Sequence, residues 1–305
     1  MEQSFDTYGA AVDYINATPK FTTKNSREDT ARFWERLGYP GKNSKILHIA
    51  GTNGKGSVCA YLSSVLGKAG ISCGMFTSPH LVSMRERFVI NGTMVSEADF
   101  LYAFGVVMEG VKGLPAASHP TFFELLFFMA MVLFEKYGVE YVILETGLGG
   151  RLDATNVVEE KKLCIITSIG YDHMEYLGET LSEIAGEKAG IMRPGVSVVY
   201  PDRQEDVTRV MEACAEKIGA KTFPIGKDAI KEMKIRHKTI DFSLHLNYYD
   251  YIGFTVSTSA VYQIENAALA IKALERLSDE RITVPVMQEG IRKTVWEGRM
   301  EEIAP

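Results

Sequence analysis

The residues with the clearest capacity for chemistry form a glycine-rich loop at positions 51–57. Its members are Gly51, Thr52, Asn53, Gly54, Lys55, Gly56 and Ser57. A short apolar run at 45–50, typical of a buried strand, precedes the loop, and helical spacing of apolar residues at 57–69 follows it. Backbone N–H groups at such a strand-to-helix turn bind phosphate, and Lys55 adds a positive charge. The loop therefore predicts a phosphate site.

The loop departs from the strict phosphate-loop pattern G-x-x-x-x-G-K-[ST]. Gly56 separates Lys55 from Ser57, and position 49 is Ile where the pattern requires Gly. A tight strand-to-helix turn with an exposed lysine would explain the same residues. The loop alone therefore does not decide between a phosphate site and a plain turn, and other polar residues are needed to support a phosphate site.

Two such residues follow other expected strands. Glu145 ends the apolar run at 141–145, and His173 comes shortly after the run at 163–168. Ligands bind at the carboxyl ends of strands in open parallel sheets, where Ser57 would also lie. Carboxylate and hydroxyl oxygens, completed by ATP phosphates, suit Mg²⁺, whereas imidazole is a less usual ligand for so hard a cation. Each residue also has a plain structural explanation, as a helix cap or a packed histidine.

The pattern of elements predicts an α/β fold. Expected strands at 45–50, 72–76, 141–145, 163–168, 196–199 and 221–224 alternate with helical segments, which indicates a doubly wound, mostly parallel sheet. Capping boxes are expected to open helices at Ser96 with Asp99, at Thr121 with Glu124 and at Thr180 with Glu183. Period-two alternation near residues 230–257 predicts a small antiparallel β region.

Composition excludes several classes of protein. The 305 residues carry 33 basic and 39 acidic side chains, a formal net charge of −6, so no nucleic-acid partner is expected. The longest apolar run, at 125–134, is too short to cross a membrane and predicts a buried helix. The four cysteines form no C-x-x-C pair, and the N-terminus lacks the pattern of a secretory signal. We therefore expect a cytoplasmic protein with reduced cysteines and no membrane partner.

Together the motifs resemble the folylpolyglutamate synthase/dihydrofolate synthase family of the Mur ligase superfamily, from about residue 5 to the end of the chain. The resemblance is carried, in order, by Gly51–Ser57, Thr77-Ser-Pro-His-Leu81, Glu145-Thr-Gly-Leu-Gly-Gly-Arg-Leu-Asp-Ala-Thr-Asn156, Tyr171-Asp-His173, Glu187-Lys-Ala-Gly-Ile191 and Trp296-Glu-Gly-Arg299. One departure is Tyr262, which stands where the family usually has His before Gln263.

The resemblance implies an ATP-dependent carboxylate–amine ligase that adds L-glutamate to folate, and also to dihydropteroate, through an acyl phosphate. ATP would occupy the 51–57 loop together with Asn266 and Arg299, and two Mg²⁺ ions are expected. Lys55, Lys188 and His173 would be catalytic, with Lys55 on the β and γ phosphates. Ser57, Ser78, Glu145 and His173 would supply metal ligands.

Three further expectations rest on the resemblance. Lys188 matches a lysine that is carbamylated in the family, although by itself it looks like a solvated lysine near a helix C-terminus. Phe122, Phe123 and Asp153 match positions that contact the pterin. Phenylalanines at helical spacing are more commonly core residues, so the aromatic assignment stays open.

The expected organisation is one ATP-binding domain at 1–297, followed at 298–305 by the start of a linker. The family continues into a smaller α/β domain that holds most of the glutamate pocket, so we expect this chain to be an inactive or weakly active N-terminal fragment of a monomeric enzyme. Two other functions are left open, a Mur-type amide ligase for another carboxylate and a non-catalytic nucleotide-binding module.

Overall fold

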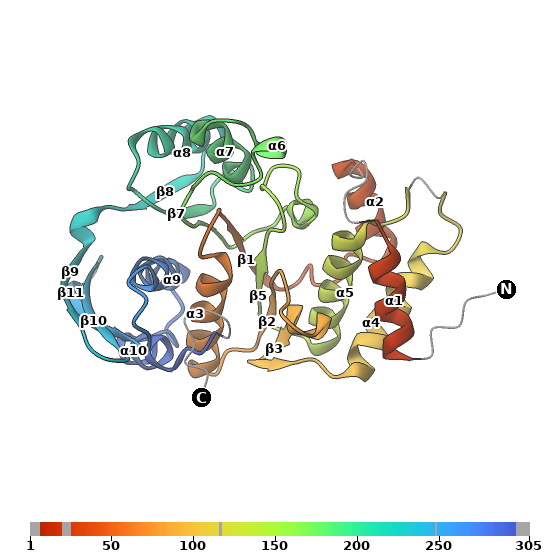
Figure 1. The fold of residues 1–305 in the computed structure, drawn as a ribbon, viewed down its shortest axis with the longest axis horizontal. Coiled ribbons are helices and arrows are strands. Elements are labelled where there is room, and N and C mark those ends of the chain that lie inside the picture. The colour runs from red at the N-terminus through yellow and green to blue at the C-terminus, as the bar shows by residue number, and fades with distance from the viewer. Residues whose placement is uncertain (1–6, 20–25, 116–117, 248, 297–305) are drawn as a thin grey trace.

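The computed structural model describes residues 7–19, 26–115, 118–247 and 249–296. Its centre is an eight-stranded sheet in the order β4-β3-β2-β5-β1-β6-β7-β8 (Figure 1). The strands are β1 (Lys45–Ala50), β2 (Cys73–Phe76), β3 (Phe88–Ile90), β4 (Thr93–Met94), β5 (Tyr141–Glu145), β6 (Leu163–Ile166), β7 (Ser197–Pro201) and β8 (Lys221–Ile225). All pair in parallel except β3 and β4, which extend one edge antiparallel. The expected doubly wound, mostly parallel sheet is confirmed.

The central strands are apolar because helices cover both of their faces. On β1, Leu47 and Ile49 point to one face, and Ile46, His48 and Ala50 point to the other. β5 and β6 are buried along their whole length. The polar His48 is fully buried among these strands, so its presence needs an explanation other than packing.

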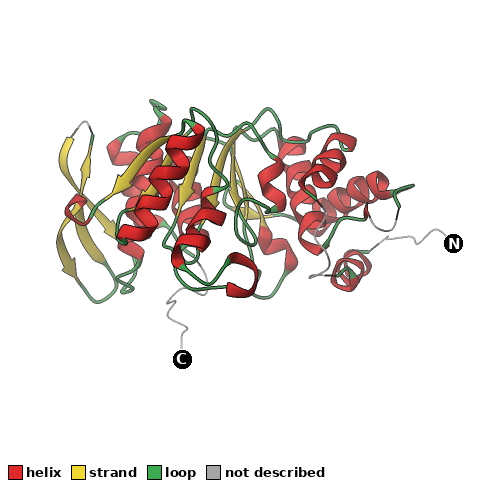
Figure 2. Cartoon of the chain, turned by 90° about the horizontal axis from the view of Figure 1, so that it is seen from above, coloured by secondary structure: helices red, strands yellow, loops and turns green. Residues whose placement is uncertain are grey.

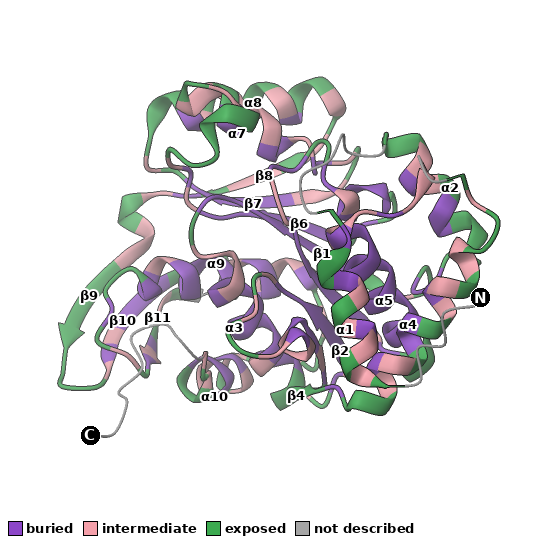
Figure 3. Cartoon of the chain, turned by 45° about the vertical axis from the view of Figure 1, so that its right-hand side comes forward, coloured by how far each residue is buried: buried purple, intermediate pink, exposed green. Residues whose placement is uncertain are grey.

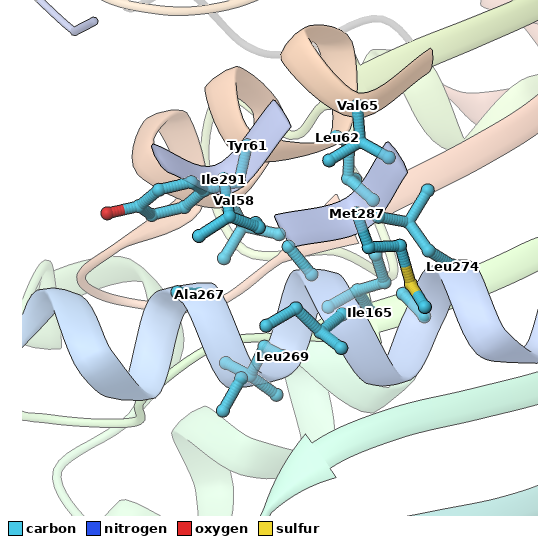
Figure 4. Close-up of a cluster of buried hydrophobic side chains, with 14 of the residues drawn as sticks. Val58, Tyr61, Leu62, Val65, Ile165, Ala267, Leu269, Leu274, Met287 and Ile291 are labelled. Atoms are coloured by element: carbon cyan, nitrogen blue, oxygen red, sulfur yellow. The ribbon is translucent and has the colours of Figure 1, made fainter. Parts of the chain in front are cut away.

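Three helices cover the Leu47 face: α3 (Lys55–Lys68), α9 (Gln263–Leu277) and α10 (Val284–Lys293). α3 contacts both α9 and α10, and their shared core includes Leu62, Ala267 and Ile291 (Figure 4). A Cβ at Gly290 would lie 2.6 Å from a methyl carbon of Val65, so glycine is what lets α10 approach α3 this closely. The packing fixes the helix that begins inside the 51–57 loop.

The opposite face carries two groups of helices, and Figure 2 shows helices on both sides of the strands. One group, α1 (Tyr8–Ala17), α2 (Arg27–Arg36), α4 (Glu97–Val111) and α5 (Phe122–Tyr137), shares a core with β2 and β5. The other, α7 (Leu181–Ala189) and α8 (Glu205–Ile218), packs with the short α6 (Met174–Leu177) on β6 and β7. α5 contains the expected buried helix at 125–134, every residue of which is buried.

The antiparallel region is a separate three-stranded sheet of β9 (Ile230–Ile235), β10 (Ile240–Leu246) and β11 (Tyr249–Val256). Its apolar side, including Ile240, Phe242 and Phe254, joins the core beneath α9. β9 forms one edge and is largely exposed, in contrast to the buried central strands (Figure 3). The expected small antiparallel region is therefore confirmed.

Two of the three expected capping boxes are complete, those of Thr121 with Glu124 and Thr180 with Glu183. The prediction of the third box, Ser96 with Asp99, is only half correct. Ser96 caps the Asp99 amide, but Asp99 bonds the Ser96 hydroxyl, Lys136 and Tyr137. The shorter aspartate side chain does not close the box, and α5 offers it stronger partners. In the described part of the chain, no helix is both long enough and apolar enough to span a membrane.

Candidate active site

A cleft of about 1110 Å³ lies where the 51–57 loop, the end of β5 and the start of α9 meet. Ten residues selected from the sequence line it: Thr52, Asn53, Gly54, Lys55, Gly56, Ser57, Ser78, Glu145, His173 and Asn266. They come from segments up to 214 positions apart, and the parallel strands bring them together at their carboxyl ends. The arrangement offers backbone amides, a lysine, hydroxyls and a carboxylate to one ligand.

The shape of the loop depends on glycines. Gly54, with φ +91°, is the N-cap of α3, and a Cβ there would overlap Asn266 Oδ1. Gly51, with φ +145°, lies so close to Thr167 that a Cβ would overlap Thr167 Oγ1. Thr52 ties the loop to the segment that follows β6, since its hydroxyl donates to the Gly170 carbonyl and accepts the Gly170 N–H, both at 3.1 Å. Contacts with Asn266 on one side, and with Thr167 and Gly170 on the other, therefore fix the conformation of the loop.

Two lysines lie against the loop backbone. Lys55 Nζ donates to the carbonyl oxygens of Gly51 and Thr52, at 3.0 and 3.1 Å. Lys188 Nζ, from α7, donates to the same Gly51 oxygen at 2.8 Å. Lys188 is only 4% exposed, so its interpretation as a solvated lysine is wrong. Burial first, and the charge of Lys55 second, lower the pKa of Lys188 to about 8.

The first turn of α3 is bonded to α9 through side chains. Gln263 Nε2 donates to Ser57 Oγ at 3.1 Å, and Asn266 Nδ2 donates to Gln263 Oε1 at 3.0 Å. Gln263 and Asn266 are both buried and stand three positions apart on one face of α9. Gln263 was not selected as a site residue from the sequence, and the Gln-x-x-Asn spacing was the signal for it.

Trp296 is a second residue that sequence reasoning did not select. A Cβ at Gly56 would lie 3.0 Å from the Trp296 ring, so the indole packs directly over the loop. Trp296 and Ser57 also line a second cavity of about 680 Å³ beside the cleft. Arg299, expected at the nucleotide, lies outside the described residues.

The acidic side of the cleft is formed by Glu145, the last residue of β5. Glu145 is 3% exposed, and its carboxylate accepts the backbone N–H of Ser78 at 3.0 Å, beside the cis Ser78–Pro79 peptide. His173 also lines the cleft; it has a left-handed backbone conformation and a half-exposed side chain, with Nε2 3.7 Å from an oxygen of Asp172. Within the described ranges, no three His, Cys, Asp or Glu side chains converge as a metal cluster.

The three residues expected at the pterin differ in what they contact. Phe122 is buried beneath the Arg87 guanidinium. Phe123 is half-buried and lies against Gly147, where a Cβ would come within 2.7 Å of its ring. Asp153 is 4% exposed, and its oxygens accept the amides of Gly147, Leu148 and Thr155 together with the Thr155 hydroxyl. In this structure Asp153 holds the loop that follows Glu145.

The sheet order, the modified phosphate loop and the acidic residue at the end of β5 define a nucleotide-binding domain of the Mur ligase class. In agreement, the family model described as "Mur ligase middle domain" matches residues 49–274, well over half of the chain.

Comparison with individual proteins narrows this class. The dihydrofolate synthase/folylpolyglutamate synthase of Bacillus subtilis is 37% identical over 97% of this chain, which spans 70% of that protein. A structure described as an FPGS–AMPPCP–folate complex superposes with a TM-score of 0.91 at 26% identity, over 98% of this chain and 74% of that one. Escherichia coli FolC in complex with DHPP and ADP superposes with a TM-score of 0.85 at 27% identity, over 100% of this chain and 70% of that one. The chain belongs to the dihydrofolate synthase/folylpolyglutamate synthase family of ATP-dependent ligases.

Proposed function

We propose that the cleft binds ATP and transfers its γ-phosphoryl group to a folate-type carboxylate. The observation that carries this proposal is the convergence of Lys55, the loop amides and buried Glu145 on one cleft. Lys55 Nζ now rests on two loop carbonyls, and a phosphate group would be a stronger partner for it because that hydrogen bond is charge-assisted at both ends. ADP and AMPPCP in related structures support the same ligand class.

The residues present fit Mg²⁺. Magnesium is usually held by one or two carboxylates, with waters and phosphates completing its shell, so a cluster of three acidic side chains is not required. Glu145 supplies the carboxylate, and Ser57 and Ser78 supply hydroxyls on the same cleft. His173 is the proposed contact to a second ion. Bound there, magnesium would neutralise charge on the transferred phosphoryl group.

Lys188 is the proposed site of carbamylation. Only a neutral amine reacts with CO₂, and a pKa of about 8 leaves an appreciable neutral fraction near neutral pH. The neutral amine forms an N–C bond with CO₂ and releases one proton. Counted from the ammonium form, two protons leave and a cation becomes an anion. The positive charge of Lys55 lies beside it on the Gly51 carbonyl and would stabilise that anion.

We propose that the two chemical steps are those of an acyl-phosphate ligase. A carboxylate oxygen attacks the γ-phosphorus and ADP leaves; the amine of L-glutamate then attacks the acyl carbon, phosphate leaves, and the nitrogen loses a proton. The family's names support folate and dihydropteroate as the carboxylates. Phe123, beside Gly147, is the better placed of the two phenylalanines for a flat ring. The cytoplasmic location and monomeric state stay predictions.

The test is glutamate-dependent ADP release with Mg·ATP and either dihydropteroate or a reduced folate, with the intact Bacillus subtilis relative as positive control. Release that requires both glutamate and the pterin compound supports the proposal. Because this chain is expected to be weakly active at most, release at a small fraction of the control rate still supports the proposal. ATP binding with no release that depends on the pterin compound, with or without glutamate, would favour a nucleotide-binding module, and release with a different carboxylate would favour another Mur-type ligase.

A further inference from the structure

His48 is a buried polar residue in the middle of the sheet that no step above uses. It lies on β1, is 0% exposed, and points to the same face as Ile46 and Ala50. Ile46 belongs to the core beneath α5, whereas Ala50 belongs to the core beneath α7. His48 therefore occupies the seam between two apolar cores, where an unpaired imidazole would be costly.

The imidazole meets one hydrogen-bond partner, the hydroxyl of Thr155. His48 Nε2 lies 2.8 Å from Thr155 Oγ1, and Thr155 Oγ1 is itself hydrogen-bonded to Asp153 Oδ1. An ionised carboxylate only accepts, so the single hydroxyl proton of Thr155 points to Asp153. Thr155 Oγ1 must then accept from His48, which places the imidazole proton on Nε2.

The other imidazole nitrogen is consistent with this assignment. Nδ1 is buried and has no hydrogen-bond partner among the described residues. With the imidazole proton on Nε2, Nδ1 is unprotonated and the ring is neutral. Protonating Nδ1 as well would place an unpaired positive charge in the apolar interior, which costs more free energy. The charged groups facing this seam are Lys161 and Arg193, and with burial they keep the pKa of His48 well below 6.5.

The chain of bonds continues from Asp153 into the cleft. Asp153 Oδ2 accepts the backbone N–H groups of Gly147 and Leu148, at 2.9 and 2.8 Å. Gly147 lines the cleft two positions after Glu145, and the Phe123 ring packs on it. The position of this turn is thus determined by a carboxylate whose other oxygen is held by Thr155.

We propose that His48 is a positioning residue that, through Thr155 and Asp153, holds the Gly147–Leu148 turn of the ligase site in place. The structural part of this inference stands without the proposed function, and only its consequence for turnover rests on it. His48 donates to Thr155, so the Thr155 hydroxyl cannot rotate away from Asp153, and both Asp153 oxygens stay oriented toward the loop.

Amide hydrogen exchange tests the structural part directly. Thr155→Val keeps the side-chain shape but removes the hydroxyl, and Thr155→Ser retains it. We expect Thr155→Val to speed exchange at the Gly147 and Leu148 amides by roughly tenfold or more, because the hydrogen bonds from these amides to the charged Asp153 carboxylate would weaken. Exchange in β6 should not change. Unaltered exchange at Gly147 and Leu148 in Thr155→Val would overturn the proposal.

The His48 variants separate positioning from simple packing. Gln can place an N–H donor near the Nε2 position, whereas Leu cannot. His48→Gln should therefore keep slow exchange at Gly147 and Leu148, and His48→Leu should lose it at similar thermal stability. Equal exchange in both variants would overturn the role of the donor.

A turnover measurement distinguishes this inference from the proposed function. In an active ligase, His48→Leu should raise the KM for the pterin carboxylate while the KM for ATP stays unchanged, and His48→Gln should restore it. Absence of any ADP release that depends on the pterin compound in the unmodified protein, together with the expected exchange pattern, would reject the proposed function and leave the positioning role intact.

Discussion

Lys55 and Lys188 donate to one and the same acceptor, the carbonyl oxygen of Gly51, at 3.0 and 2.8 Å. One lysine belongs to the first turn of α3 and the other to the last turn of α7. Two ammonium groups on one oxygen repel each other, which contributes to the lowered pKa of Lys188. A carbamate on Lys188, or a phosphate group bound to Lys55, would offset this repulsion. The proposed carbamylation and the proposed phosphate site therefore involve the same pair of lysines.

The first prediction is that Lys188 takes up CO₂. In ¹³C-bicarbonate the protein should show a carbamate carbon signal by NMR that grows as the pH rises from 6 to 8, because the neutral amine becomes more abundant as its pKa of about 8 is approached. Lys188→Gln should lack the signal, and Lys68→Gln, at an exposed lysine of α3, should retain it. A signal that persists in Lys188→Gln would assign the carbamate elsewhere.

The second prediction concerns phosphate binding. Lys55→Ala should weaken Mg·ATP binding by about tenfold or more, since a charge-assisted contact to phosphate is worth roughly 1.5–3 kcal/mol. Isothermal calorimetry measures it, and Lys68→Ala at the other end of α3 is the matched control. Equal affinities in the two variants would rule out Lys55 as a phosphate ligand.

The third prediction separates the two ends of β5. Glu145→Gln should raise the Mg²⁺ concentration needed for half-maximal ATP binding several-fold, because an amide oxygen is a weaker ligand for a hard cation than a carboxylate. Glu140→Gln is the control, since Glu140 pairs with Lys45 and Arg281 just before the same strand begins. A magnesium titration of ATP binding decides, and an unchanged midpoint in Glu145→Gln would make that residue structural.

The fourth prediction uses two glycines near α3. Gly54→Ala should abolish tight ATP binding and cost about 1 kcal/mol or more of stability, because φ is +91° and the new Cβ overlaps Asn266 Oδ1. Gly67→Ala has no atom in its way and lies in an exposed helical position, so it should stabilise the protein by about 0.5–1 kcal/mol. Denaturant unfolding and calorimetry report both effects, and normal ATP binding by Gly54→Ala would contradict the loop geometry.

The fifth prediction is a pH dependence of stability that arises from Lys161. Its Nζ is buried on Asn156 Oδ1 and the Ile191 carbonyl, and burial lowers its pKa from 10.5 to about 7. Between those two values the unfolded chain binds more protons, so stability should rise with pH, by at most roughly 1.4 kcal/mol per unit.

Lys161→Met should flatten this rise, which thermal unfolding at pH 7 and 9 measures. Lys188 contributes in the same sense above about pH 8, so the comparison is between Lys161→Met and the unmodified protein at each pH. An identical slope in the two proteins would show that Lys161 is not the titrating group.

The sheet could be predicted from the sequence because its strands are nearly continuous apolar runs that are separated by helical periodicity. β1, β5 and α8 lie where the spacing places them, and Thr121 and Thr180 cap their helices as expected. These signals are local. The strand β4 pairs with the neighbouring β3 but has only two residues, too few to show a period. The failure of Asp99 to close its box depends on Lys136, a partner distant in sequence, which periodicity does not reveal.

The candidate site likewise has features that the sequence predicts and features that only the packing decides. The sequence by itself determined the residue types that line the cleft, because the 51–57 loop, Glu145 and His173 each follow a recognisable strand. Only the tertiary structure decided that Lys188 is buried on the Gly51 carbonyl, 137 positions away, and that His48 reaches Asp153 through Thr155. Burial and hydrogen-bond direction arise where separate segments meet, so they are properties of the packed molecule and are not encoded in any one segment.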